Sequence, residues 1–204
     1  MSELTTYDLK VRLEFTDDLL GTASANPDIH AEFIASKAPD PDTIEDEVAA
    51  IGVEGVVEKS KTIFPRTEKG EPFLYDYQIR GFFKEACGFL KKVPKTISSG
   101  IKAHKKMVDG LVFVKEREIP LHLPKGAELT DLQRPLRAST PQGERVSLAN
   151  SEVAPAGTWI EFTVQCMVKD DLKAVKEWLG YGKHKGLGQW RNSGKGRFEV
   201  TYPE

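Results

Sequence analysis

The chain has 204 residues, of which 39% are hydrophobic and 29% charged, and its formal net charge is −2. This length and composition are ordinary for one domain with a well-developed core. No apolar run reaches the roughly 20 residues that cross a bilayer, and the N-terminus lacks a signal-peptide pattern, so we expect a cytoplasmic protein with no membrane partner. Cys87 and Cys166 fall in a helix pattern and a strand pattern and are expected to be buried, which argues against a disulfide framework.

The charges are separated along the chain. Residues 28–58 contain nine acidic residues and one basic residue, residues 80–106 contain eight basic residues and one acidic residue, and residues 183–197 contain five basic residues and no acidic residue. A near-neutral protein with such a separation can present a local surface that attracts anions.

The first quarter of the chain predicts a strand followed by helices. Apolar and polar residues alternate over residues 7–15, which is typical of a half-buried strand. Asn26 and Thr43 then begin two short patterns with acidic first turns, which predict an acidic helical insertion over residues 26–60.

The clearest helix pattern lies over residues 79–92, where apolar residues recur at helical spacing. Residues 93–108 are basic and lack a clear period, so we expect a mobile loop there. The later patterns predict, in chain order, one or two strands over 110–124, a long hairpin or loop over 124–157 carrying Arg134, Arg137 and Arg145, a strand over 158–168, a helix over 171–182 capped by Asp170, and a strand over 196–202.

This order of elements predicts a ferredoxin-like α+β fold, in which helices cover one face of an antiparallel sheet. We expect a single domain over residues 1–204, with the acidic helical insertion at 26–60 and basic loop and hairpin insertions at 93–157.

The sequence near the C-terminus, GLGQWRNSGKGRFEV over residues 186–200, combines glycines, cations and one tryptophan. Its glycine spacing fits neither a dinucleotide-binding fingerprint nor a Walker phosphate loop. The four histidines show no metal-ligand spacing, and no serine lies in a nucleophile context, so we expect no metal and no cofactor.

The chemistry of this loop favours a site for phosphates joined to bases. Glycines allow backbone N–H groups to approach an anion closely, lysines and arginines supply charge, and an aromatic ring supplies a stacking face. The alternative is a structural glycine turn with Trp190 packed in the core. The candidate binding residues in the loop are Lys183, Lys185, Gly186, Gly188, Trp190, Arg191, Asn192, Ser193, Gly194, Lys195, Gly196 and Arg197.

The loop has two glycine pairs, Gly186-Leu187-Gly188 and Gly194-Lys195-Gly196, separated by five residues. This pattern resembles the glycine-rich loop of the RAMP superfamily of CRISPR-associated proteins, with Lys195 where that family usually has a hydrophobic residue. Other segments, LEFTDDLLGTAS, FPRTEKGEPFLYDYQIRGFFKEA and GERVSLANSEVAPAGTWIEFTV, are similar to segments of the backbone subunits of type III effector complexes. The chain also resembles uncharacterised bacteriophage proteins, which implies a stand-alone role in counter-defence.

The resemblance implies a modified RRM-like fold that binds RNA along its phosphates, with Arg80 and Lys84 at the start of the first helix contributing. We expect the exposed sheet face to lack stacking aromatic residues, so that RNA readout across the sheet is not expected. The residues expected on that face are Lys10, Arg12, Glu14, Glu161, Thr163, Gln165, Arg197 and Glu199.

The leading hypothesis is therefore a non-catalytic protein that binds RNA or another oligonucleotide, alone or with a CRISPR or other defence component. A homo-oligomer is a further partner state that the sequence leaves open. Three alternatives remain open. The protein could sequester a small cyclic oligonucleotide, cleave RNA without a metal by using His30 as a general base, or mimic a CRISPR subunit by docking its acidic 28–58 segment on a basic partner. The resemblance also implies a catalytic aspartate after the first strand in subunits that cut target RNA, and Asp28 lies in that region although its sequence context does not match.

Overall fold

The computed structural model describes residues 4–25, 61–140 and 143–204, and the side chains of all of these except 135–148. The two helices expected within 26–60, together with Asp28 and His30, lie outside the described residues. Among the described residues, no helix combines the length and the apolar character that crossing a bilayer requires.

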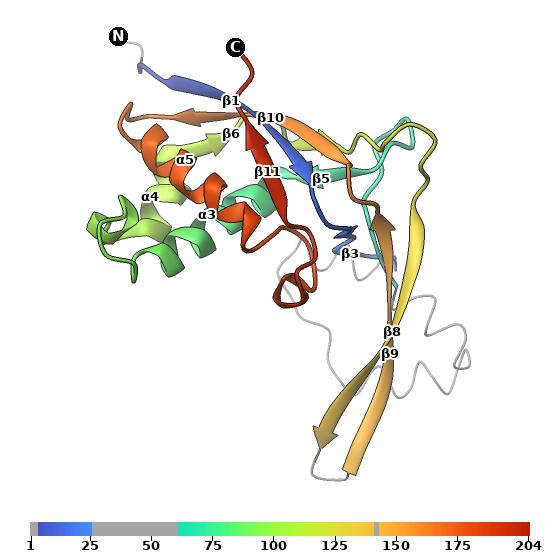
Figure 1. Ribbon diagram of the computed structural model, residues 1–204. Helices are drawn as coiled ribbons and strands as arrows, with labels where there is room; N and C mark the ends of the chain where they lie inside the picture. Colours follow the sequence, from blue (N-terminus) through green and yellow to red (C-terminus); the bar gives the residue numbers. More distant parts are fainter. Residues whose placement is uncertain (1–3, 26–60, 141–142) are drawn as a thin grey trace.

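Four antiparallel strands form the main sheet, in the order β11-β1-β10-β6 (Figure 1). With the helices α3 and α5, they follow the chain order strand, helix, strand, strand, helix, strand, which is that of the ferredoxin-like fold. The α+β prediction is therefore confirmed. The elements are β1 (Tyr7–Phe15), α3 (Asp76–Leu90), β6 (Val112–Val114), β10 (Trp159–Cys166), α5 (Asp171–Gly180) and β11 (Phe198–Thr201).

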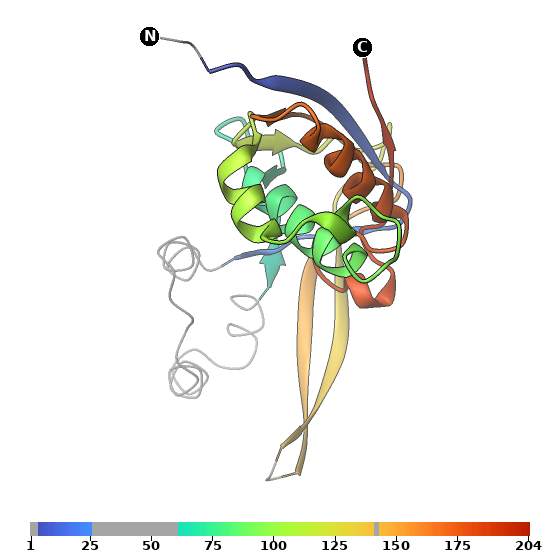
Figure 2. The same cartoon turned by 90° about the vertical axis from the view of Figure 1, so that its left-hand side faces the viewer.

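The core lies between one face of this sheet and the helices. Figure 2 shows α3, α4 (His104–Leu111) and α5 gathered in front of the strands. Alternate residues of β1 and β10 point toward the helices, as their sequence alternation predicts, and pack against the apolar face of α3. Trp178 of α5 is fully buried, and its indole N–H donates to Ser98 Oγ at 2.9 Å. Both cysteines are buried as expected.

A second sheet lies at the end of β1 and contains a long ribbon. Strands β8 and β9 pair with each other from Thr130–Val153 to Thr140–Gly143, and they extend away from the body in both views (Figures 1 and 2). This confirms the hairpin expected within 124–157. The sheet consists of β2 (Leu19–Leu20), β3 (Ala23–Ser24), β4 (Thr62–Ile63), β8 (Thr130–Thr140) and β9 (Gly143–Ala154), and a separate pair consists of β5 (Phe73–Tyr75) and β7 (Glu118–Pro120).

Residues 93–108 are not the loop that we expected. They contain a short 3₁₀ turn over Ser98–Gly100 and the first part of α4. Val108 is fully buried, and Ile101 and Met107 pack against the core. Packing against α3 therefore stabilises this helix. Because the helix is short and rich in surface lysines, its sequence shows no clear apolar periodicity.

Two smaller expectations need correction. Asp170 is the N-cap residue of α5, as expected, but its side chain makes no capping hydrogen bond with a backbone N–H and instead accepts one from Lys173 Nζ at 2.9 Å. The outer sheet face does carry an aromatic residue, Trp159, which is described with the site below.

Candidate nucleic-acid interface

The glycine-rich loop connects α5 to β11 and crosses over itself. The Leu187 N–H donates to the Gly196 carbonyl at 2.9 Å, and a Cβ on Gly186 or Gly196 would lie 2.0 Å from backbone atoms of the opposite arm. Gly188 has a φ of +76°, and a Cβ there would lie 2.8 Å from the Leu20 carbonyl oxygen. At these three positions the glycines are therefore required by the path of the loop itself.

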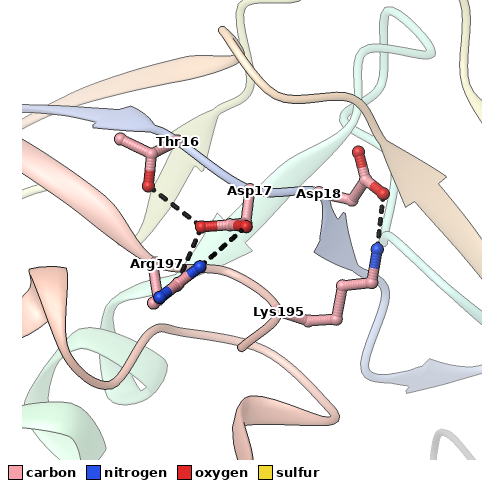
Figure 3. A network of polar contacts seen from close by, with 5 residues as sticks. All are labelled: Thr16, Asp17, Asp18, Lys195 and Arg197. Atoms are coloured by element: carbon pink, nitrogen blue, oxygen red, sulfur yellow. Dashed lines mark hydrogen bonds and ion pairs between the residues drawn. The ribbon is translucent and has the colours of Figure 1, made fainter. Parts of the chain in front are cut away.

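Two consecutive aspartates after β1 fasten this loop to the sheet (Figure 3). The Asp17 carboxylate accepts two hydrogen bonds from the Arg197 guanidinium, at 2.9 and 3.1 Å. Lys195 Nζ reaches Asp18 Oδ2 at 2.6 Å, and the Gly196 N–H donates to the Asp18 carbonyl at 2.8 Å. The hydrogen bonds from Arg197 lower the pKa of Asp17, and those to Asp17 raise the pKa of Arg197. Arg197 and Lys195 thus secure the base of the loop.

The other cations expected to bind nucleic acid also have carboxylate partners, with one exception. Glu85 of α3 pairs with Lys185 at 2.9 Å and with Arg191. Arg80 pairs with Asp76 at 3.1 Å, and Lys84 pairs with Asp109 at 2.5 Å. Lys183 is exposed and has no carboxylate partner in the part of the chain that the structure describes.

An open groove runs along the outer surface of the loop, and we refer to it as the loop groove. Its volume is about 630 Å³, and among the residues that line it three cations face one carboxylate. Arg191 and Lys185 share Glu85, while Arg134 brings a further charge, so this wall is net positive. The lining residues are Glu85, Arg134, Lys185, Gly188, Gln189, Trp190, Arg191, Asn192 and Ser193.

Trp190 lies in this groove and not in the core cluster, so the structural alternative for that residue was wrong. Its backbone adopts a left-handed conformation with a φ of +55°, which is uncommon for a residue with a side chain. The Arg134 guanidinium lies 4.9 Å from the centre of the indole ring, and Arg134 Nη1 is 3.4 Å from Ser193 Oγ. The root of the β8–β9 ribbon therefore contacts the loop.

A second cavity of about 320 Å³ adjoins the groove, between the first turns of α3 and the loop, and we call it the helix pocket. Glu85, Gly188 and Arg191 line both hollows, so the two form one continuous surface. The other lining residues of the helix pocket are Thr22, Ala23, Tyr77, Gln78, Gly81, Phe82 and Leu187.

The outer face of the main sheet presents a different arrangement. Trp159 lies beside the Arg12 guanidinium, 3.9 Å from the ring centre, and beside His122, whose ring centre is also 3.9 Å away. Two groups at that distance must cover opposite faces of the indole, so neither face is open to a base. Arg197, which we expected on this face, precedes β11 and pairs with Asp17.

The structure therefore gathers only part of the predicted set. The loop groove is lined by Lys185, Gly188, Trp190, Arg191, Asn192 and Ser193. The loop is shaped or fastened by Gly186, Gly194, Lys195, Gly196 and Arg197. Neither hollow is lined by Arg80, Lys84 or Lys183. Glu85 and Gln189 were not among the predicted site residues, and Arg134 was predicted only as part of the hairpin. A lone acid in the apolar helix pattern was the one available signal for Glu85.

The fold, but not the sequence, resembles that of known proteins. No protein-family model matches the chain, and no curated protein does. A chain in the cryo-EM structure of the type III-B Cmr-beta bound to cognate target RNA superposes with a TM-score of 0.56 at 12% identity. The match covers 97% of this chain but only 60% of that one. A chain of a type IV-B CRISPR complex gives a TM-score of 0.49 at 12% identity and covers 97% of this chain and 90% of that chain.

Proposed function

We propose that this protein is a RAMP-type RNA-binding component of a CRISPR-type complex, and that a single RNA strand lies in the loop groove. The likeness of the fold to the Cmr-beta chain supports the family, together with the glycine pattern of the loop over 186–196. We further propose that residues 1–204 act as one domain, with 26–60 as an insertion.

The net positive loop groove carries this proposal. Arg134, Lys185 and Arg191 provide three cations for phosphates against the single carboxylate of Glu85. Trp190 adds a large aromatic ring in the same groove, and Asn192 and Ser193 lie beside it. A positively charged groove with aromatic side chains is the arrangement that binds single strands through phosphates and base stacking. The exposed Asn192 and Ser193 provide hydrogen-bonding groups for the same strand.

The internal ion pairs fit this role. Glu85 holds Lys185 and Arg191 in position before RNA arrives, and a phosphate can then take over part of their hydrogen bonding. Of the three cations that line the groove, Arg134 alone has no carboxylate partner among the described side chains, so within the groove its charge is the most available to a phosphate.

Replacing Arg134 tests this proposal, because the side chain is exposed and its loss leaves the core untouched. For a fluorescein-labelled 20-nucleotide single-stranded RNA, we expect Arg134→Ala to raise the Kd by about tenfold. The slope of log K against log salt should fall by about 0.7, because one fewer phosphate is neutralised. Fluorescence anisotropy over a series of KCl concentrations measures both quantities.

Lys173→Ala is the matched control, because it also removes one positive charge and its side chain is 72% exposed on α5, outside both hollows. It should bind RNA as the wild type does. Equal affinity of Arg134→Ala and the wild type at every salt concentration would contradict binding in the loop groove.

A further inference from the structure

Gly81 belongs to α3, the longest helix of the described residues, and no packing contact in the described structure requires a glycine at this position. It lies in the interior of α3, where glycine lowers helix stability relative to alanine. Apart from its chain neighbours and the adjacent backbone of α3, a Cβ added to Gly81 would find no described atom within 4 Å, whereas a Cβ on Gly88 of the same helix would lie 3.6 Å from His104 Nε2. Neither close packing nor an unusual φ angle therefore requires glycine at position 81.

Gly81 does, however, line the helix pocket. The missing side chain leaves open space at the wall of a cavity of about 320 Å³, which is near the lower limit for a small-molecule site. Phe82 and Leu187 contribute apolar surface to the same cavity, and Tyr77, which is 36% exposed, contributes an aromatic ring. A flat, partly apolar group of modest size matches these walls.

The polar groups of the pocket are preorganised. Gln78 Oε1 accepts from the Tyr75 N–H at 2.7 Å, and Gln78 Nε2 donates to Thr22 Oγ1 at 2.5 Å. The amide orientation is thereby fixed, while the second of its two N–H groups has no acceptor in the part of the chain that the structure describes. Glu85 and Arg191 add an acceptor and a donor at the border with the loop groove. Nucleobase edges present both donors and acceptors, so they can use both kinds of group.

We propose that one nucleobase of the bound RNA turns into the helix pocket and lies over Gly81, while its flanking phosphates follow the loop groove. The inference rests on the proposed function, since the strand must first lie in that groove. Continuity of the two hollows at Glu85, Gly188 and Arg191 supplies the path. Glycine at position 81 then leaves the space that the base occupies.

Filling the pocket from the helix tests this inference. Gly81→Leu places a good helix former in α3 and directs its side chain into the space above position 81. Two probes are compared, a 12-nucleotide single-stranded RNA and a 12-nucleotide abasic strand with the same ribose-phosphate backbone. We expect Gly81→Leu to weaken binding of the RNA by at least about fivefold, the loss of roughly one stacked base, and to leave binding of the abasic strand unchanged.

Gly110→Leu is the matched control, because Gly110 is an exposed glycine of α4 that also has no described atom within 4 Å of an added Cβ and lines neither hollow. Both leucine variants should melt at or above the wild-type temperature, and Gly110→Leu should bind both probes normally. RNA affinity of Gly81→Leu equal to that of Gly110→Leu, with Arg134→Ala still impaired, would overturn the base pocket and leave the loop groove standing. Equal weakening of both probes would also overturn it, because the backbone would then occupy the pocket. Failure of the wild type to bind RNA would overturn both proposals.

Discussion

Individual charges in this protein are arranged in pairs across long sequence separations. Arg197 and Asp17 are separated by 180 residues, and Arg191 and Glu85 by 106. The sequence shows a run of cations near the C-terminus, but it gives no sign of which acids neutralise them. Lys195 and Arg197 each have an aspartate of their own and fasten the loop, whereas Lys185 and Arg191 share the single carboxylate of Glu85 and leave positive charge in the groove. The ion pairs therefore separate the cations that fasten the loop from those that can bind phosphate.

The crossing of the glycine-rich loop makes a strong prediction at Gly196. Its φ is +70°, and an added Cβ would lie 2.0 Å from the Leu187 carbonyl oxygen. We expect Gly196→Ala to lower the free energy of unfolding by about 3 kcal/mol or more, because strain and overlap act together. Urea denaturation measures the loss.

Gly70→Ala separates these two causes. Gly70 has a similar φ of +81°, but no described atom lies within 4 Å of the added Cβ. Backbone strain alone should cost about 1 kcal/mol there. Equal losses at the two positions would show that the loop arms do not cross as tightly as described.

At the level of elements, the alternating strands and the long helix were predictable because each buries one face. Val11 and Leu13 of β1, and Ile160 and Phe162 of β10, are all buried, as the period of two requires. The short helix α4 was not predictable, because only a few apolar residues in a lysine-rich segment mark its buried side. Its stability comes from contacts with α3, which no local pattern reveals.

The β8–β9 ribbon is an appendage of the second sheet. Apart from its pairing with β8, β9 pairs with β4 at Ser151 and with β2 at Val153 and Ala154, all at the inner end of the ribbon. A two-stranded ribbon has little stability of its own in water. The outer part of the ribbon should therefore contribute little to the stability of the fold.

Shortening the ribbon tests this expectation. Arg134 and Ala149 are directly opposite each other, so residues 135–148 can be replaced by Asn-Gly, the pair preferred in two-residue hairpin turns. We expect the melting temperature to fall by less than about 4 °C, which corresponds to roughly 1 kcal/mol for a protein of this size. Thermal unfolding followed by circular dichroism measures it, and a fall of more than about 10 °C would show that the ribbon belongs to the cooperative core.

For the molecule as a whole, the ferredoxin-like core supports two surfaces of different character. On the outer sheet face, charged groups pair with one another: Arg12 pairs with Glu161 and also covers Trp159, and Lys115 pairs with Asp8. The second surface contains the open loop groove and the helix pocket, and the groove has more positive than negative side chains. The sequence predicted the loop and its chemistry, whereas the pocket depends on a juxtaposition of α3, β2–β3 and the loop that only the fold creates.

Crosslinking tests the central claim most directly. The protein is irradiated with a single-stranded RNA that contains 4-thiouridine at every uridine, and the crosslinked peptides are identified by mass spectrometry. RNA in the loop groove and the helix pocket should crosslink at Trp190 or Tyr77, because these aromatic residues line the two hollows. Crosslinks confined to the sheet face around Trp159, with none at Trp190 or Tyr77, would contradict the account.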